Sequence, residues 1–211
     1  MARAFSTYYE EQILRLIRKM RLPKGDRVLD AGCGSHARFQ SAIESLGYSY
    51  VGIDREPPEG NNNTLRFDFN QGFPTIDFDH LICINSLQTF EKGEDFMERV
   101  AKGVKRGGKV FLTLPNRKSF HYRLWKWMDR YVYHDHSFIN PLTEQSVAAF
   151  FEKQGFRLLE RGGVMAFPNQ VGLISPSFLQ PLWVRVDDWL DWLFKRKANR
   201  YSYTYLILTR E

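Results

Sequence analysis

Short apolar runs alternate along the chain with segments in which apolar residues recur every three or four positions. The short runs are typical of strands buried in a sheet, and the longer spacing is typical of amphipathic helices. In the first helix, Thr7 and Glu10 have the spacing of a capping box, and Pro23 and Gly25 end the helix. Further helices are predicted at residues 36–46, 92–105 and 143–154. The predicted strands are residues 27–30, 48–54, 64–68, 78–84, 109–114, 156–164 and 201–209.

This alternation predicts the fold class. Right-handed crossovers between strands give an α/β, doubly wound, Rossmann-like sheet that is mostly parallel, with helices on both faces. The sheet should have seven strands, and the last should be antiparallel because no crossover pattern precedes it. Ligands bind beyond the carboxyl ends of such strands. The loops after Asp30, Asp54, Asp68 and Ile84 should therefore surround one crevice.

The composition is that of a globular protein whose positive charge lies in two segments. The 211 residues carry a formal charge of +6, and 43% of them are hydrophobic, which excludes a disordered chain. Residues 117–130 and 195–200 each contribute a local excess of positive charge, which is compatible with phosphate binding. We expect a single domain over residues 1–211. Its N-terminal helix lies in residues 1–24, and two inserts, 117–142 and 165–200, form a lid or an interface.

The cysteines and the N-terminus favour a cytoplasmic location. Cys33 and Cys83 are too few for a disulfide framework and are expected to be reduced. The N-terminus lacks the apolar core of a signal peptide. Residues 162–184 are uncharged, but three prolines interrupt them, so we do not expect a spanning helix. A peripheral contact with a membrane stays open.

A glycine turn follows the first predicted strand. Gly32 and Gly34 let the backbone turn sharply and approach a ligand closely, and together with Ala37 they fit a weak dinucleotide pattern. Asp30 argues against a dinucleotide, because its carboxylate would repel a pyrophosphate. The turn therefore suits a positively charged ligand without phosphate, such as S-adenosylmethionine.

Two further aspartates follow the next two strands. Asp54 comes 20 residues after Gly34, where an acidic side chain can accept hydrogen bonds from both ribose hydroxyls. Asp68 is placed to accept a hydrogen bond from an exocyclic adenine amine. Each aspartate alone also suits a structural role, because Asp at a strand end often caps a turn. Three of them, each after a predicted strand, favour a shared ligand.

The motifs along residues 25–160 resemble, in order and spacing, those of class I S-adenosylmethionine-dependent methyltransferases. The chain departs from the pattern at His36, where the family often has a third glycine, and at Gln88 and Thr89, where relatives commonly have Glu-His. The segments that carry the resemblance are residues 28–34, 51–55, 67–69, 78–90, 107–116 and 155–156. The resemblance implies S-adenosylmethionine as cofactor and the following cofactor-binding residues: Asp30, Gly32, Gly34, Asp54, Arg55, Asp68, Phe69 and Asn85.

Methyl transfer to a small or lipid-like acceptor, at oxygen, is the expected function. Residues 134–141 are similar to His-containing segments of quinone-type and small-molecule O-methyltransferases. His136, and less well His134, are candidate general bases, since His titrates near neutrality. A surface histidine that caps a loop is the alternative. No metal site is expected, because the separations between His121, His134 and His136 match no standard zinc pattern.

Other functions and partners stay open. One alternative is a noncatalytic adapter with this fold. A nucleic-acid methyltransferase is a second, but the absence of proline after the fourth predicted strand disfavours it. A nicotinamide-dependent oxidoreductase is a third, and Asp30 disfavours it. Residues 120–133 interleave aromatic and basic side chains, and residues 179–200 have an apolar helical stripe followed by basic residues. These two segments suit a substrate lid, a peripheral membrane contact or a homodimer surface.

Overall fold

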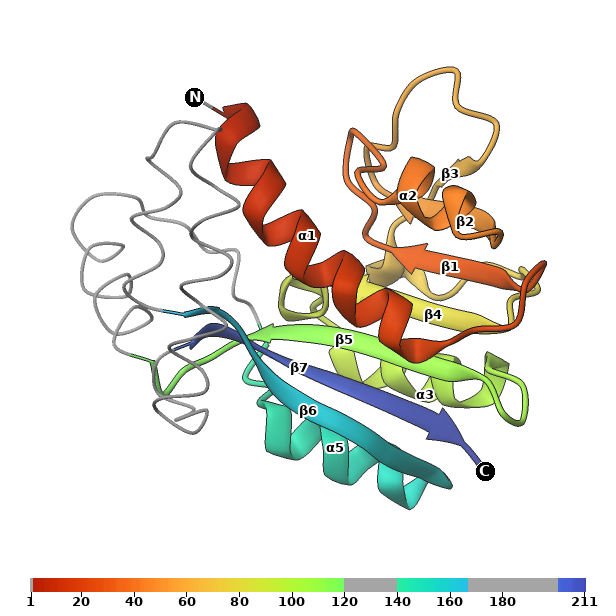
Figure 1. Cartoon of the computed structure of the whole chain (residues 1–211). Coiled ribbons are helices and arrows are strands. Elements are labelled where there is room, and N and C mark those ends of the chain that lie inside the picture. Colours follow the sequence, from red (N-terminus) through yellow and green to blue (C-terminus); the bar gives the residue numbers. More distant parts are fainter. Residues whose placement is uncertain (1, 120–139, 167–200) are drawn as a thin grey trace. The chain divides into compact units, whose positions relative to one another are not determined.

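The computed structural model describes residues 2–119, 140–166 and 201–211 (Figure 1). Its helices are α1 (Ala2–Met20), α2 (Gln40–Ser45), α3 (Gly93–Gly103) and α5 (Glu144–Lys153). Two short 3-10 turns, η1 (Phe69–Gln71) and η2 (Leu87–Thr89), follow the third and fourth strands. The strands are β1 (Arg27–Ala31), β2 (Ser49–Asp54), β3 (Thr64–Arg66), β4 (His80–Ile84), β5 (Lys109–Pro115), β6 (Phe156–Ala166) and β7 (Tyr201–Arg210).

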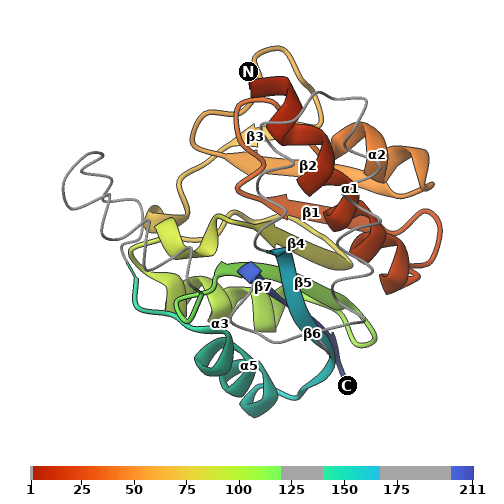
Figure 2. The same cartoon turned by 60° about the vertical axis from the view of Figure 1, so that its left-hand side comes forward.

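The seven strands form one sheet in the order β3-β2-β1-β4-β5-β7-β6 (Figure 2). β1 pairs in parallel with β2 and β4, β2 with β3, and β4 with β5. β7 is antiparallel: the Gly107 N–H donates to the Arg210 carbonyl, and the Arg210 N–H donates to the Gly108 carbonyl. The predicted fold class is confirmed. The direction in which successive strands are added to the sheet reverses between β1 and β4. The loops that follow these two strands therefore meet at the carboxyl edge of the sheet.

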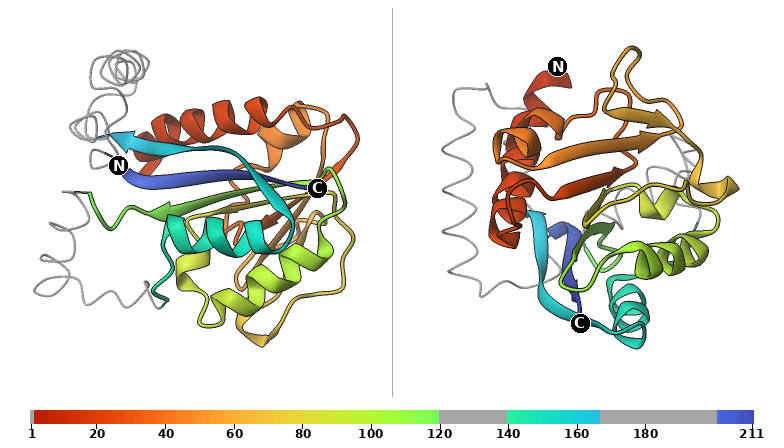
Figure 3. Two further views of the ribbon diagram at one scale, coloured as in Figure 1. Left: turned by 90° about the horizontal axis from the view of Figure 1, so that it is seen from below. Right: turned by 90° about the vertical axis from the view of Figure 1, so that its right-hand side faces the viewer.

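Helices cover both faces of the sheet. α3 and α5 lie together on one face, and α2 lies on the other (Figure 3). Phe96, Met97 and Val100 of α3 and Val147 and Phe151 of α5 are buried in one hydrophobic core with the apolar side chains of the strands. β4 is buried at all five positions, as expected for a central parallel strand.

Three predicted boundaries are wrong. α1 begins at Ala2, so Thr7 lies inside the helix and does not cap it, because residues 2–6 contain no proline or glycine that would end a helix there. α2 begins at Gln40, because Ala37 has a φ of +40°, which a right-handed helix excludes. β3 ends at Arg66, so Asp68 lies beyond the strand and is the N-cap of η1.

Hydrogen bonds that involve the side chains of His80 and Asp79 connect the amino ends of the central strands. The Lys109 N–H donates to Nδ1 of the buried His80 at 3.0 Å, so the proton of the neutral ring is on Nε2, which donates to Asp26 at 2.8 Å. Asp79 accepts from the Arg27 N–H and from Lys105, and these bonds hold the pKa of its carboxyl below the usual range. These contacts fix the edge of the sheet opposite to the carboxyl ends.

The described residues belong to two compact units. The larger holds residues 20–114, 140–161 and 205–211. The smaller includes residues 2–19, and within it the ring centres of Tyr9 and Tyr203 lie 5.9 Å apart. Among the helices of the described ranges, none has the length and hydrophobicity needed to cross a membrane.

Candidate functional site

The glycine turn after β1 packs tightly against the loop after β4. Gly32 has a φ of +82°, and its N–H donates to the Ile53 carbonyl of β2 at 2.7 Å. A Cβ at Gly32 would lie only 2.2 Å from Oγ of Ser86, and that hydroxyl donates to the Gly32 carbonyl at 3.1 Å. Only glycine therefore fits at this position, both for its backbone conformation and for the space available.

Asp54, the last residue of β2, holds the other side of the turn. One carboxylate oxygen accepts from the Gly34 N–H at 2.9 Å, and the other accepts from the Glu56 N–H at 3.0 Å. Each oxygen has a second lone pair, so the carboxylate can still accept two hydrogen bonds from a ligand.

Asp68 and Asn70 connect the loop after β3 to the loop after β4. Oδ1 of Asp68 accepts from the Asn70 N–H at 2.9 Å, which caps η1. Oδ1 of Asn70 accepts from the Glu91 N–H at 2.8 Å, beyond η2. Asp68 thus has the structural role that aspartates often play after a strand, and its other oxygen remains available to a ligand.

These loops enclose a pocket at the carboxyl edge of the sheet. Five of the predicted cofactor residues line it: Gly32, Asp54, Arg55, Asp68 and Phe69. The sequence analysis did not assign the other lining residues to the cofactor; these are Phe67, Asn70, Ser86, Thr89 and Phe90. The hydroxyls of Ser86 and Thr89, just after a buried strand, were the available signal. With two carboxylates and one guanidinium, the lining favours hydroxyl and amine donors over phosphate.

Three predicted residues lie outside the pocket lining. The Gly34 N–H is engaged by Asp54, but no atom comes within 4 Å of a Cβ built on Gly34, so the space above the turn is open. Asn85 has a φ of +53°, and its N–H and carboxamide oxygen both bond to the Thr113 hydroxyl at 2.8 Å. Asp30 is buried within β1.

Comparison with known proteins identifies the family. Residues 2–161 match the family described as "Methyltransferase domain". The chain belongs to this family.

Relatives of this methyltransferase-domain protein include an uncharacterized protein of Methanocaldococcus jannaschii. That protein is 25% identical over 205 residues, which cover 90% of this chain and 82% of the relative.

Solved structures with the same fold include two methyltransferases. A SAM-dependent methyltransferase from Archaeoglobus fulgidus has a TM-score of 0.65 at 19% identity, with 95% of this chain and 94% of that chain covered. Magnesium protoporphyrin IX methyltransferase from Synechocystis, with bound SAH, has a TM-score of 0.60 at 14% identity, with 95% and 81% covered.

The buried carboxyl of Asp30 has a perturbed pKa. Burial raises its pKa to about 7, although the Tyr50 hydroxyl, which donates to Oδ2 at 2.9 Å, lowers it. Burial, Asp30 and Asp54 together raise the pKa of the Cys33 thiol to about 12, so Cys33 is not a nucleophile at neutral pH. Both cysteines are free, as expected.

The residues present fit an adenosine-type cofactor with a cationic end. The open space above Gly34 admits a ligand against the backbone, and the free lone pairs of Asp54 suit vicinal hydroxyls. In residues 2–119, 140–166 and 201–211, no group of three or more His, Cys, Asp or Glu side chains is placed to hold a metal ion.

His134, His136 and most of the two predicted inserts lie outside the described residues. Their candidate roles as general bases, lid or interface therefore stay predictions.

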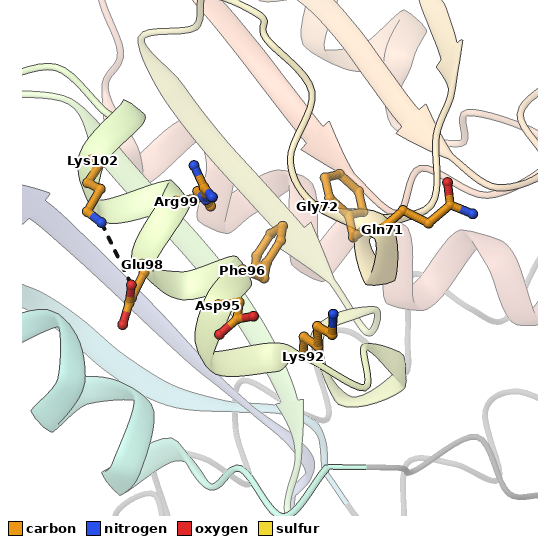
Figure 4. A pocket seen from close by; sticks show the side chains of 9 residues that line it. Gln71, Gly72, Lys92, Asp95, Phe96, Glu98, Arg99 and Lys102 are labelled. Carbon is orange, nitrogen blue, oxygen red and sulfur yellow. Dashed lines mark ion pairs between the residues drawn. The ribbon is translucent and has the colours of Figure 1, made fainter.

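A second hollow lies between η1 and α3 and shares Phe69 with the pocket (Figure 4). Its rim carries Lys92, Arg99 and Lys102 together with Asp95 and Glu98, and Lys102 lies 3.8 Å from Glu98. The ring of Phe69 is buried among Phe67, Phe73, Phe90 and Phe96, with centre distances of 5.1–6.1 Å. Phe69 therefore supports the pocket from inside the core.

Proposed function

We propose that this protein transfers a methyl group from S-adenosylmethionine to a small or lipid-like acceptor, at oxygen. The observation that carries the proposal is the Asp54 carboxylate, which orders the glycine turn through Gly34 and lines the same pocket as Asp68. A pocket with these two carboxylates and the hydroxyls of Ser86 and Thr89 suits a phosphate-free nucleoside. Family membership supports methyl transfer as the reaction.

In this proposal the nucleoside lies on the edge formed by the loops after β2, β3 and β4. Asp54 accepts the two ribose hydroxyls with its remaining lone pairs. Asp68 accepts from the adenine amine, Phe69 backs the adenine, and Arg55 covers its edge. These residues bind and orient the ligand, and none of them takes part in a proton transfer.

The glycine turn receives the methionine end. Gly32 and Gly34 allow close approach of the backbone, and Asp30 beneath the turn stabilises a positive charge when it is ionised. The sulfonium supplies an activated methyl group, so the protein contributes alignment and exclusion of water. Asn85 is assigned to the border of the methyl position, and His136 or His134 to removal of the acceptor proton.

The test is calorimetric titration of the protein with S-adenosylhomocysteine. The wild type should bind, and Asp54→Ala should bind about 10- to 100-fold more weakly, because two charge-assisted hydrogen bonds are lost. Asp77→Ala is the matched control, because Asp77 is an exposed aspartate outside the pocket lining. Unchanged affinity in Asp54→Ala would contradict the assigned role. No binding by the wild type would favour the noncatalytic adapter.

A further inference from the structure

The loop after β4 presents three side chains to the nucleoside pocket. Ser86, Thr89 and Phe90 all line it. Two backbone hydrogen bonds close the turn: the Thr89 N–H donates to the Ser86 carbonyl at 2.9 Å, and the Phe90 N–H donates to the Leu87 carbonyl at 3.2 Å. Two such bonds do not offset the backbone entropy that is lost when a turn of this length is ordered. Contacts from outside the loop must therefore hold its conformation.

Asn140, which lies outside the pocket lining, supplies such contacts. Its Nδ2 donates to the carbonyls of Leu87 at 2.6 Å and Phe90 at 2.9 Å. Its backbone N–H donates to the Gln88 carbonyl at 3.4 Å. Three carbonyls of the loop are thus bonded to one residue that lies far along the chain, just before α5.

The carboxamide of Asn140 is itself held in place. Its Oδ1 accepts from the Leu142 N–H at 3.2 Å, and Leu142 is buried in the hydrophobic core. The next residue, Thr143, forms the capping box of α5 with Ser146. A Cβ on Gly93, the first residue of α3, would lie 2.7 Å from Nδ2 of Asn140, so glycine leaves the space that the carboxamide occupies.

An asparagine suits this position because a carboxamide has two N–H donors and an acceptor oxygen, whereas a carboxylate of the same shape cannot donate. Leu87 and Phe90 are 0% and 8% exposed, and a buried carbonyl that loses its donor is costly. Without the carboxamide, the turn would leave this conformation and carry Thr89 and Phe90 with it. Phe90 also packs against Phe69, with ring centres 5.1 Å apart, so the wall of the pocket would change.

We infer that Asn140 is a positioning residue for the cofactor, because it holds the loop after β4 in the conformation that binds the nucleoside. This inference rests on the proposed function, which places the nucleoside in this pocket. Asn140 acts through the backbone of the loop. Affinity for the cofactor is proportional to the fraction of molecules in which the loop has the binding conformation, so a residue outside the pocket sets that affinity.

The test is calorimetric titration with S-adenosylhomocysteine under conditions where urea denaturation shows each variant to be folded. Asn140→Ala should bind at least about fivefold more weakly than the wild type, because the hydrogen bonds that favour the binding conformation are lost. Asn116→Ala is the matched control. Asn116 is also 6% exposed, its Nδ2 donates to the Tyr201 carbonyl at 2.9 Å, and its Oδ1 accepts from the Lys118 N–H, but it lies outside the pocket lining. Its affinity should stay within about twofold of the wild type.

A second variant perturbs the same contact from the other side. Gly93→Ala keeps Asn140 but places a Cβ against its Nδ2, so it should weaken S-adenosylhomocysteine binding at least about threefold. Most of this loss should disappear when Gly93→Ala is added to Asn140→Ala, since the colliding group is then absent. The single variant Gly93→Ala keeps the inference testable whether or not Asn140→Ala folds.

Hydrogen exchange measured by NMR separates positioning from general stability. Without ligand, the amides of Thr89 and Phe90 should exchange at least about tenfold faster in Asn140→Ala and Gly93→Ala than in the wild type. The amide of Ile82 in the buried strand β4 should keep its wild-type rate. Saturating S-adenosylhomocysteine should slow the two loop amides again, because the ligand selects the binding conformation.

Four results would overturn the inference. These are wild-type affinity in Asn140→Ala or in Gly93→Ala, an equal loss of affinity in Asn116→Ala, a full Gly93→Ala loss in the double variant, and equal acceleration of exchange in β4 and in the loop. Each would assign Asn140 to stability alone. Failure of the wild type to bind S-adenosylhomocysteine is distinct, because it would overturn the proposed function as well.

Discussion

Replacing Asp30 with asparagine should stabilise the protein at alkaline pH and remove part of its pH dependence. Burial raises the pKa of this carboxyl from 3.8 to about 7. At a pH between these two pKa values, Asp30 keeps its proton in the folded protein but has released it in the unfolded chain. The contribution of Asp30 to stability is therefore present at low pH and is lost as the pH rises from about 4 to about 7.

The size of the effect follows from the shift. About three pKa units correspond to about 4 kcal/mol, at about 1.4 kcal/mol per unit. The free energy of unfolding of Asp30→Asn should thus exceed that of the wild type by up to about 4 kcal/mol at pH 8, and the two should converge near pH 4. The value at pH 8 is an upper limit, because the amide introduces donors into a buried position.

The assay is urea denaturation of both proteins, without ligand, at intervals between pH 4 and pH 8.5. The quantity of interest is the difference in unfolding free energy between wild type and Asp30→Asn, since other groups titrate equally in both. Tyr50→Phe is the matched control. It removes the hydroxyl that lowers the pKa of Asp30, so the fall in stability should extend to higher pH.

A difference in unfolding free energy that stays constant between pH 4 and pH 8 would contradict this prediction, because Asp30 would then not titrate in that range. If the difference changes as expected, the protein keeps a carboxylate that destabilises it. Loss of S-adenosylhomocysteine affinity in Asp30→Asn at pH 8 would then show what this residue contributes to function.

Three further predictions concern the turn, the cofactor and the opposite edge of the sheet. S-adenosylhomocysteine affinity should fall by up to about tenfold per pH unit below pH 7, because the ammonium group of this ligand prefers the ionised carboxyl of Asp30. Calorimetry at several pH values should show this dependence in the wild type and its loss in Asp30→Asn. Gly32→Ala should lower the free energy of unfolding by more than the cost of a left-handed backbone, which is about 1–2 kcal/mol, because the new Cβ would collide with Ser86. Adding Ser86→Gly should restore part of this loss in urea denaturation, and no recovery in the double variant would contradict the prediction. His80→Ala should lower the free energy of unfolding by about 2–4 kcal/mol in denaturation, because it removes two hydrogen bonds of a buried side chain. Affinity for S-adenosylhomocysteine should stay unchanged, since these bonds lie at the amino edge of the sheet. A parallel loss of affinity would show that the two edges are coupled.

Particular residues show how far the sequence predicted the candidate site. Asp54 and Gly32 are recognisable because a strand, an acidic residue and a glycine turn have a fixed spacing along the chain. Asp68 was predicted at the end of a strand, whereas the structure places it at the start of η1. Its place in the pocket was nevertheless predicted, because the loop after β3 faces the same edge in either case.

The sequence did not reveal which side chains of the loop after β4 face the pocket. It favoured Asn85, which the structure places on Thr113, while Ser86, Thr89 and Phe90 line the pocket. The reason is a local backbone geometry that the sequence pattern does not show: Asn85 has a left-handed φ of +53°, and a 3-10 turn begins two residues later.

Local sequence patterns were enough to predict the fold class, the order of most elements and the edge of the sheet where the pocket lies, because hydrophobic periodicity and turn residues act locally along the chain. Three features became visible only in the folded chain: Asp30 is buried against Tyr50, Ser86 requires glycine at position 32, and Asn140 supports a loop 50 residues away. Burial, close approach and hydrogen-bond satisfaction depend on which distant segments meet, and the local pattern of a sequence does not contain that information.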